Sequence, residues 1–206
     1  MYNQKPYKAK SEEDVLNFLK SYPFASITVF ANGDYHSTQI PFLLNQQEDQ
    51  LYLEGHVMKD TDHYKAFLQN NNVFVLFTGP NCYVSASWYK NPQSGSTWNY
   101  MSVQVKGTLE FMTNEELSRF MDKLTLKYEA HNANSPTYIK NLPEDYVNRL
   151  MPMITGIKIK VNHLEHTFKL SQDKDKISFD NIIKQLRQKG FNAKQVAAEM
   201  QKLKST

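Results

Sequence analysis

The chain has 206 residues and a mass of 24.0 kDa, enough for one large domain to bury its own core without disulfides or structural metals. Its composition, 40% hydrophobic and 22% charged, excludes disordered and fibrous proteins, and the single cysteine, Cys82, excludes an internal disulfide framework. The net charge is only +3, but residues 158–206 hold eleven basic and five acidic residues, which could attract a polyanion or simply form a solvated lysine-rich surface. No apolar run approaches the ~20 residues that cross a bilayer, and acidic residues 12–14 stand where a signal peptide would be apolar, so we expect a cytoplasmic protein without a membrane span.

The first predicted elements are a short helix and a β-hairpin. A Ser-x-x-Asp capping box and apolar residues at helical spacing predict a helix over residues 12–20. Residues 24–30 and 35–44 are predicted as two strands around Asn32-Gly33, a dipeptide that accepts the positive φ angles of a tight turn. Pro41 lacks a backbone N–H, so the second strand is expected at a sheet edge or with a bulge.

A group of strands around one helix comes next. Residues 51–55 are predicted as a strand, residues 60–69 as a helix, and the apolar residues 73–78 as a strand at the centre of the core. Strict alternation of apolar and polar residues over 101–111 predicts a strand with one face on the core and the other in solvent.

The rest of the chain is mostly helical. A second capping box precedes a predicted helix over 114–130, and a short helix is expected over 144–150. A last long strand is predicted over 154–170, followed by two helices with a break at Gly190 and Asn192. About six strands with helices gathered late indicate an α+β fold on an antiparallel sheet or barrel, with a C-terminal helical pair.

Several common chemistries have no motif in the sequence. It contains no glycine-rich phosphate loop, no GxGxxG after a strand, no GxSxG elbow and no HExxH, which removes the main support for P-loop, Rossmann and nucleophilic-hydrolase functions. His163 and His166 fall on opposite faces of a strand, and a metal site would need His36, His56 and His63 to converge in space, which their spacing does not decide. We therefore predict no metal site.

One polar cluster lies between a predicted strand and the helix after it. It combines Gly55-His56 with Lys59 and Thr61 at a helix N-terminus, where free amides and the helix dipole attract phosphate. Capping of the helix by Asp60 or Thr61 explains the same residues without a ligand.

Two further clusters adjoin other strand ends. Both tryptophans lie in residues 85–89 and 97–100, where aromatic walls and polar groups suit a flat heteroaromatic ligand or pack on neighbouring strands. Residues 169–172, Lys-Leu-Ser-Gln, could meet an anionic or carbonyl oxygen, or could form a plain strand-to-helix turn.

Four segments resemble a known family. They are MYNQKPYK at the start, GPNCYVSASWY at 79–89, TWNYMSVQVKGTLEF at 97–111 and GIKIKVNHLEHTFKLSQ at 156–172, and they resemble the PaiB-like family, described as FMN-binding negative transcriptional regulators with a flavin split-barrel fold. SVQVKGTLEFMTNEE is also similar to a strand-to-helix passage of pyridoxamine phosphate oxidase relatives. The resemblance covers essentially the whole chain. It implies an antiparallel flavin split β-barrel with peripheral helices over residues 1–175, a C-terminal helical extension over 176–206 packed on the same domain, FMN as cofactor, and a homodimer.

The resemblance also implies a set of cofactor-binding residues. The phosphate end of FMN is assigned to His56, Lys59 and Thr61, and the ring or ribityl chain to Thr97, Trp98 and Asn99. Lys169, Ser171 and Gln172 are assigned to close the site. The sequence departs from the family pattern at Gln39, Met58, Thr61, Asp62 and Asp173. A carboxylate at Asp62 would repel a phosphate unless it turns away or caps the helix.

Three functions remain open at this point. The resemblance implies an FMN-binding negative regulator of transcription, but direct DNA binding has weak support, because residues 191–198 match only the first part of a helix-turn-helix and no recognition helix follows. What remains is salt-sensitive, unselective binding through the basic C-terminal part. A flavin-dependent oxidoreductase is the first alternative, with His56 the one titrating candidate inside a matched motif and no catalytic residue identified. The second is a split-barrel interaction protein with a decayed flavin site, a dimer that FMN does not stabilise.

Overall fold

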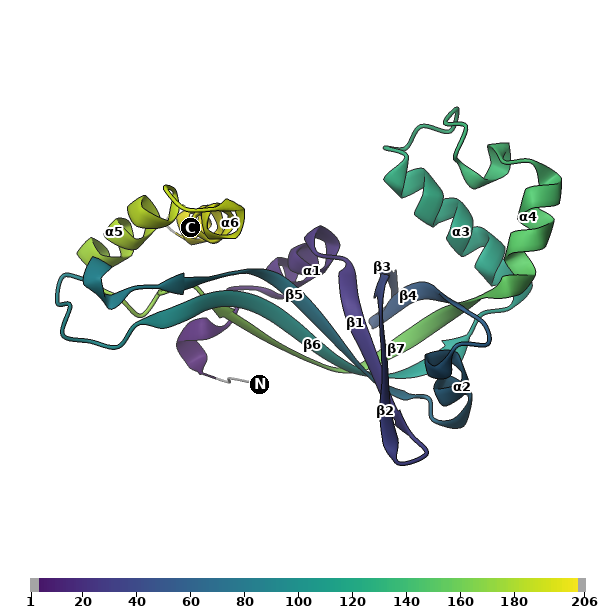
Figure 1. The fold of residues 1–206 in the computed structure, drawn as a ribbon, viewed down its shortest axis with the longest axis horizontal. Coiled ribbons are helices and arrows are strands. Elements are labelled where there is room, and N and C mark those ends of the chain that lie inside the picture. Colours follow the sequence, from purple (N-terminus) through teal and green to yellow (C-terminus); the bar gives the residue numbers. More distant parts are fainter. Residues whose placement is uncertain (1–3, 204–206) are drawn as a thin grey trace. The chain divides into compact units, whose positions relative to one another are not determined.

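The computed structural model describes residues 4–203, which form an α+β fold (Figure 1). Within these residues seven strands make one antiparallel sheet in the order β2-β1-β5-β6-β7-β4-β3. The strands are β1 (Phe24–Ala31), β2 (Asp34–Pro41), β3 (Leu43–Gln47), β4 (Gln50–Met58), β5 (Asn72–Val84), β6 (Thr97–Phe111) and β7 (Ile154–Lys169). The expected fold class is confirmed.

The described chain divides into two compact units. The first contains residues 4–22, 77–104 and 165–203, and the second contains residues 23–76 and 105–164. The predicted boundary between residues 175 and 176 therefore stays a prediction.

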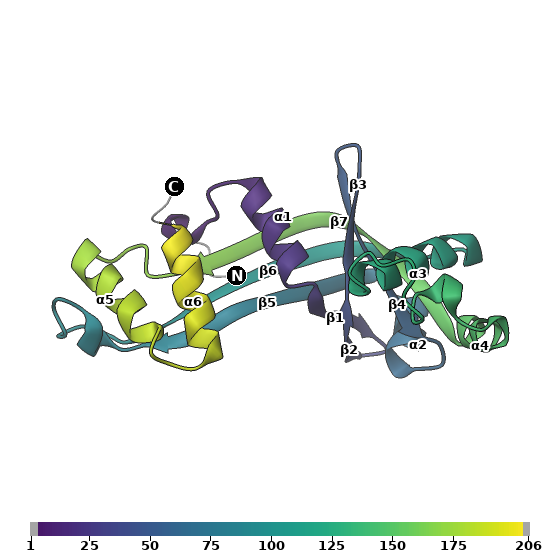
Figure 2. The same cartoon turned by 90° about the horizontal axis from the view of Figure 1, so that it is seen from above.

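Three helices belong to the first unit, together with two 3-10 turns. They are α1 (Glu12–Ser21), α5 (Lys176–Leu186), α6 (Phe191–Lys202), η1 (Lys5–Tyr7) and η2 (Ala86–Trp88). Helix α1 begins at the predicted capping box, in which Ser11 and Asp14 each accept the other's backbone N–H. Helices α5 and α6 pack on each other (Figure 2) through buried apolar residues that include Ile182, Leu186 and Val196, so the predicted helical pair is confirmed.

Two hairpins and three helices make up most of the second unit. The helices are α2 (Asp62–Gln69), α3 (Asn114–Tyr128) and α4 (Glu144–Leu150), with 3-10 turns η3 (Ile139–Asn141) and η4 (Met151–Met153). The first hairpin turns at Asn32 and Gly33, whose φ angles of 54° and 83° fit the predicted tight turn. Helix α3 begins at the predicted Thr113–Glu116 capping box and buries Leu117, Phe120 and Leu124.

The structure corrects several element boundaries. The single strand predicted over 35–44 is wrong, because β2 ends at Pro41 and β3 begins at Leu43. Strand β2 pairs with β1, whereas β3 pairs with β4 from Leu43 opposite Glu54, so the sheet has seven strands rather than about six. Pro41 does lie on an edge strand, as predicted.

Other elements differ only in length. Strand β5 continues past the predicted end to Val84, β6 begins at Thr97 instead of 101, and α2 begins at Asp62 because Asp60, with φ 65°, is not helical. Of the resembling segment MYNQKPYK, the first three residues lie outside the described residues and Lys5–Tyr7 forms η1. Among residues 4–203, every helix is too short or too polar to traverse a lipid bilayer.

Candidate functional site

Two predicted site residues meet at strand ends in the first unit. Lys169, the last residue of β7, donates from Nζ to Thr97 Oγ1 of β6 at 2.5 Å. The Lys169 ammonium also lies 5.8 Å from the ring centre of Tyr7 in η1, a cation–π contact. Because Thr97 Oγ1 acts as acceptor in this bond, its hydroxyl hydrogen is left to donate to another oxygen.

A second pair of predicted residues is completely enclosed. Ser171 donates its hydroxyl hydrogen to Asn99 Oδ1 at 3.0 Å, and the Asn99 amide nitrogen lies 3.5 Å from the sulfur of Met200 in α6. Both residues are buried, so they hold the strand end and the turn after β7 in place rather than offering a surface to a ligand.

The amide of Gln172 is also committed to this turn. Its Oε1 accepts from the N–H of Leu170, and its Nε2 donates to Phe168 O, each at 2.6 Å. Asp173, one of the departures from the family pattern, pairs with Lys174 at 3.1 Å. Residues 169–172 thus build the strand-to-helix turn, and Lys169 is the charged residue among them.

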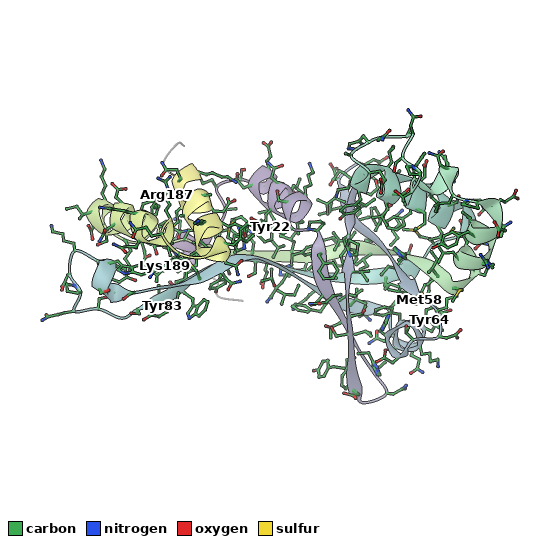
Figure 3. All side chains as sticks on the ribbon, turned by 45° about the horizontal axis from the view of Figure 1, so that its top comes forward. Tyr22, Met58, Tyr64, Tyr83, Arg187 and Lys189 are labelled. Carbon is green, nitrogen blue, oxygen red and sulfur yellow. The ribbon has the colours of Figure 1, made fainter. Side chains whose placement is uncertain are left out.

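Trp98 points to the other face of the strand. Successive side chains of a strand alternate between faces, so Trp98 cannot face the same way as its neighbours Thr97 and Asn99. Trp98 is 55% exposed and packs edge-to-face on Tyr83 of β5, with ring centres 6.3 Å apart. Tyr83 lies on the side of the strands turned away from α5 and α6 (Figure 3).

His56 lies in the second unit on β4, under helix α3. Its ring centre is 5.9 Å from that of Phe120, and its buried Nδ1 has no hydrogen-bond partner among the described residues. Burial lowers the pKa of His56, because removing the ring from water disfavours the imidazolium. His56 is therefore a neutral group with one unpaired nitrogen and cannot offer a positive charge to phosphate at neutral pH.

Thr61 caps helix α2 in the second unit. Its Oγ1 accepts from Tyr64 N at 3.3 Å and donates to Met58 O at 3.0 Å, so a ligand would have to displace one of these bonds. The neighbouring Lys59 uses its backbone N–H on Met153 O at 2.9 Å. Met58 and Tyr64 on either side of this corner are labelled in Figure 3.

Asp62 is oriented by two histidines. Its Oδ1 accepts from the backbone N–H of His63 at 2.8 Å, and Oδ2 lies 3.7 Å from His36 Nδ1. The bonds from the backbone and side chain of His63 lower the pKa of Asp62, so the carboxylate is ionised at neutral pH. A negative charge thus stands beside the residues that were assigned to the phosphate end.

The predicted residues therefore fall into three groups. Thr97 with Lys169, and Asn99 with Ser171, are brought together in the first unit. His56, Lys59 and Thr61 belong to the second unit, and Trp98 faces away from the first group.

Two aromatic neighbours were missed in the sequence. Tyr83 could have been found from the alternation along β5, which puts it on the exposed face of its strand. Tyr7 carries no such signal, because it is 162 positions from Lys169 in the sequence.

The donors of the first unit fit a phosphorylated flavin in their chemistry. An ammonium and a hydroxyl with a hydrogen to donate, at Lys169 and Thr97, suit phosphate, hydroxyl or carbonyl oxygens. The second unit fits less well, since the His56 ring is neutral and Asp62 is negative. Among the described residues no three His, Cys, Asp or Glu side chains gather where they could hold a metal ion.

Comparisons with known proteins agree with this chemistry. A family described as "Putative FMN-binding domain" matches residues 1–163. Protease synthase and sporulation protein PAI 2 of Bacillus subtilis is 32% identical over 202 residues, which cover 98% of this chain and 97% of that protein. The cofactor named by the matching family is FMN, as the sequence predicts.

Solved structures share the fold. An FAD and heme binding protein from Mycobacterium smegmatis superposes with a TM-score of 0.57 at 16% identity, covering 78% of this chain and 72% of that one. A flavocytochrome from Azotobacter vinelandii gives a TM-score of 0.52 at 16% identity, covering 78% and 68%. These likenesses confirm the predicted split-barrel fold.

Proposed function

The chain belongs to the putative FMN-binding domain family, and from this premise we propose that it is a PaiB-like protein that binds FMN through the Lys169–Thr97 pair, acts as a homodimer and regulates transcription negatively. The observation that carries the proposal is the convergence of these two side chains, 72 residues apart, at adjoining strand ends. Both come from segments that resemble the family. When bound, FMN would supply any redox chemistry.

The residues of the first unit take different parts in this proposal. Lys169 and Thr97 bind, through an ammonium and a hydroxyl that donate to oxygens of FMN. Asn99, Ser171 and Gln172 act as positioning residues, because their side chains fix the strand end and turn that carry Lys169.

The assignment of His56, Lys59 and Thr61, which belong to the second unit, to the phosphate end of FMN stays a prediction. Within that unit, the charge of Lys59 and the dipole at the N-terminus of α2 would attract a phosphate. His56 would act as a neutral hydrogen-bonding group through its unpaired Nδ1.

A homodimer is supported by an exposed aromatic pair. Tyr83 and Trp98 are 50% and 55% exposed and contact each other on one face of the strands. Exposed aromatic rings in contact are a common feature of protein–protein interfaces. We expect Trp98→Ser to shift the protein toward monomer in analytical ultracentrifugation, and an unchanged dimer would exclude this face as the interface.

FMN titration followed by quenching of flavin fluorescence tests the central proposal. Lys169→Met should weaken FMN binding at least ten-fold, because a charge-assisted hydrogen bond is lost, whereas Lys184→Met, which removes an exposed lysine of α5 in the same unit, should leave it unchanged. FMN binding that is equal in both variants, or absent in the unchanged chain, would contradict the proposal. A folded dimer without FMN affinity would favour a decayed flavin site.

The regulatory role needs its own measurement. A gel shift at several salt concentrations separates operator recognition from unselective attraction to the basic residues of the segment 158–206. Reduction of bound flavin by NADH or NADPH, followed by turnover of an acceptor, would instead favour the oxidoreductase alternative.

A further inference from the structure

The first unit contains a cavity that the proposed flavin site does not use. It has a volume of about 470 Å³ and lies among the N-terminal segment, α1, α6 and the ends of β6 and β7. Small-molecule sites typically measure roughly 300–1,000 Å³. Gln172 is the one predicted cofactor residue that lines it, and both ends of its amide are already bonded to backbone groups.

The floor of the cavity is apolar and fixed. It is formed by Phe18, Met101, Phe168 and Leu170, all of them buried. The rings of Phe18 and Phe168 are 5.1 Å apart and tilted by 43°. Gly79 lies directly under Phe18, where a Cβ would come within 2.5 Å of Phe18 Cε2, so the ring is seated against backbone. Such a floor suits a flat or slender apolar body.

Two lysines at the rim lack an acidic partner among the described residues. Lys8 Nζ donates to His166 O at 3.2 Å, and Lys10 Nζ lies 3.5 Å from Leu203 O. A backbone carbonyl accepts a hydrogen bond but does not neutralise an ammonium charge. Each ammonium has three hydrogens, so both can still donate to an anion.

The acidic residues at the rim are already engaged. Asp14 belongs to the capping box at the positive end of the α1 dipole, and Glu199 pairs with Lys202 at 2.8 Å. The lining therefore favours an anionic head group over a cationic one.

The phenol of a tyrosine in the cavity lining can donate a further hydrogen bond to an anion. Tyr22, labelled in Figure 3 at the end of α1, lines the cavity. Burial, and then the charge of Glu199, raises the pKa of Tyr22, so its hydroxyl keeps its proton and can donate to an oxygen at neutral pH.

We propose that this cavity binds a small amphipathic carboxylate, with an aromatic or aliphatic body on the Phe18–Phe168 floor and the carboxylate held by Lys8 and Lys10. The inference stands apart from the proposed flavin binding, because the cavity and the Lys169–Thr97 pair use different side chains.

Three probes that share one phenylethyl group and differ in their terminal group test which charge the cavity prefers. Calorimetric titration of the full chain at low ionic strength, with FMN in excess, would compare 3-phenylpropionate, 3-phenylpropan-1-ol and 3-phenylpropylamine. We expect the carboxylate to bind with at least about five-fold higher affinity than the alcohol, and the amine to bind most weakly. Equal binding of all three, tighter binding of the amine, or no binding would overturn the proposal.

Variants locate the site. Lys8→Gln with Lys10→Gln should reduce carboxylate affinity to that of the alcohol, whereas Lys20→Gln, an exposed lysine of α1 outside the cavity lining, should not. Asn17 of α1 is exposed and lines the cavity, so Asn17→Trp should fill the cavity and weaken the binding of all three probes. Thermal unfolding confirms that each variant is folded.

The two proposals fail separately. Competition between FMN and 3-phenylpropionate would assign the cavity to the flavin and overturn this inference. Carboxylate binding that is unaffected by FMN would support it, and would do so even if FMN did not bind.

Discussion

Ser171 and Asn99, 72 residues apart, form a hydrogen bond of 3.0 Å in which both side chains are at most 1% exposed. Ser171 has a φ of 58°, in the left-handed region that residues other than glycine rarely adopt. The bond thus fixes a turn that the backbone alone would not favour, directly beside Lys169.

Replacing the serine should therefore destabilise the protein. Ser171→Ala leaves Asn99 Oδ1 buried without its donor and should lower the free energy of unfolding by about 1–3 kcal/mol in urea denaturation. Ser171→Gly should cost less, because glycine tolerates this φ angle. Ser94→Ala, an exposed serine of the same unit, is the matched control. Equal stability of Ser171→Ala and the unchanged protein would contradict a structural role.

Gly79 should tolerate no side chain. In Gly79→Ala the new Cβ would come within 2.5 Å of Phe18 Cε2 and 3.0 Å of Cζ, so the ring must move out of its buried seat. We expect a loss of about 1–3 kcal/mol of unfolding free energy, as for other overpacked cores. Gly95→Ala, which meets open space, should have a negligible effect in the same measurement. A smaller penalty in the double variant Gly79→Ala with Phe18→Leu would attribute the loss to this contact.

Thr61 allows helix capping and phosphate binding to be separated. Thr61→Ala removes the N-cap of α2 and should cost about 1 kcal/mol of stability. Thr61→Asp keeps a capping oxygen but adds a negative charge, so stability should be largely retained while FMN affinity falls if the phosphate lies nearby. Unchanged FMN affinity in Thr61→Asp would remove Thr61 from the cofactor site and leave it the cap alone.

The burial of His56 should make stability depend on pH. Its pKa is lowered from 6.5 in the folded chain, so the unfolded chain takes up a proton at a pH where the folded chain does not. The contribution of neutral His56 to the free energy of unfolding is fully present above pH 6.5. It is lost as the pH falls from 6.5 through the lowered pKa of the folded chain. His56→Leu should flatten this part of the stability–pH curve, measured by urea denaturation.

A second histidine limits the size of that change. Burial also lowers the pKa of His166, which contributes in the same direction and remains in the His56→Leu variant. His163→Leu, at an exposed position of β7, serves as the control. An unaltered slope in His56→Leu would mean that the imidazole stays hydrated.

Most of the fold follows from local patterns in the sequence. The capping boxes at Ser11 and Thr113 give the helix starts because the same side chains satisfy the free amides in the structure. The Asn32-Gly33 turn is correct for a similar local reason. The division between β2 and β3 could not be predicted, since it depends on strand pairing: β2 pairs with β1, and β3 pairs with β4.

The candidate site was harder to predict. Motif resemblance selected Thr97 and Lys169, but their contact depends on the pairing of distant strand ends, which local patterns do not specify. The capping role of Thr61 was one of the two sequence interpretations, and the structure shows this contact.

Because side chains alternate along β6, neighbouring residues of the segment TWN face different surroundings. Thr97 and Asn99 face the interior beside α6 and the turn after β7, whereas Trp98 faces the exposed side of the strand. Randomising the three positions together would disturb the packing of Thr97 and Asn99 at the same time as the contacts that Trp98 makes on the exposed side. Varying Trp98 alone would allow variants to be selected for dimer formation while the packing of Thr97 and Asn99 stays unchanged.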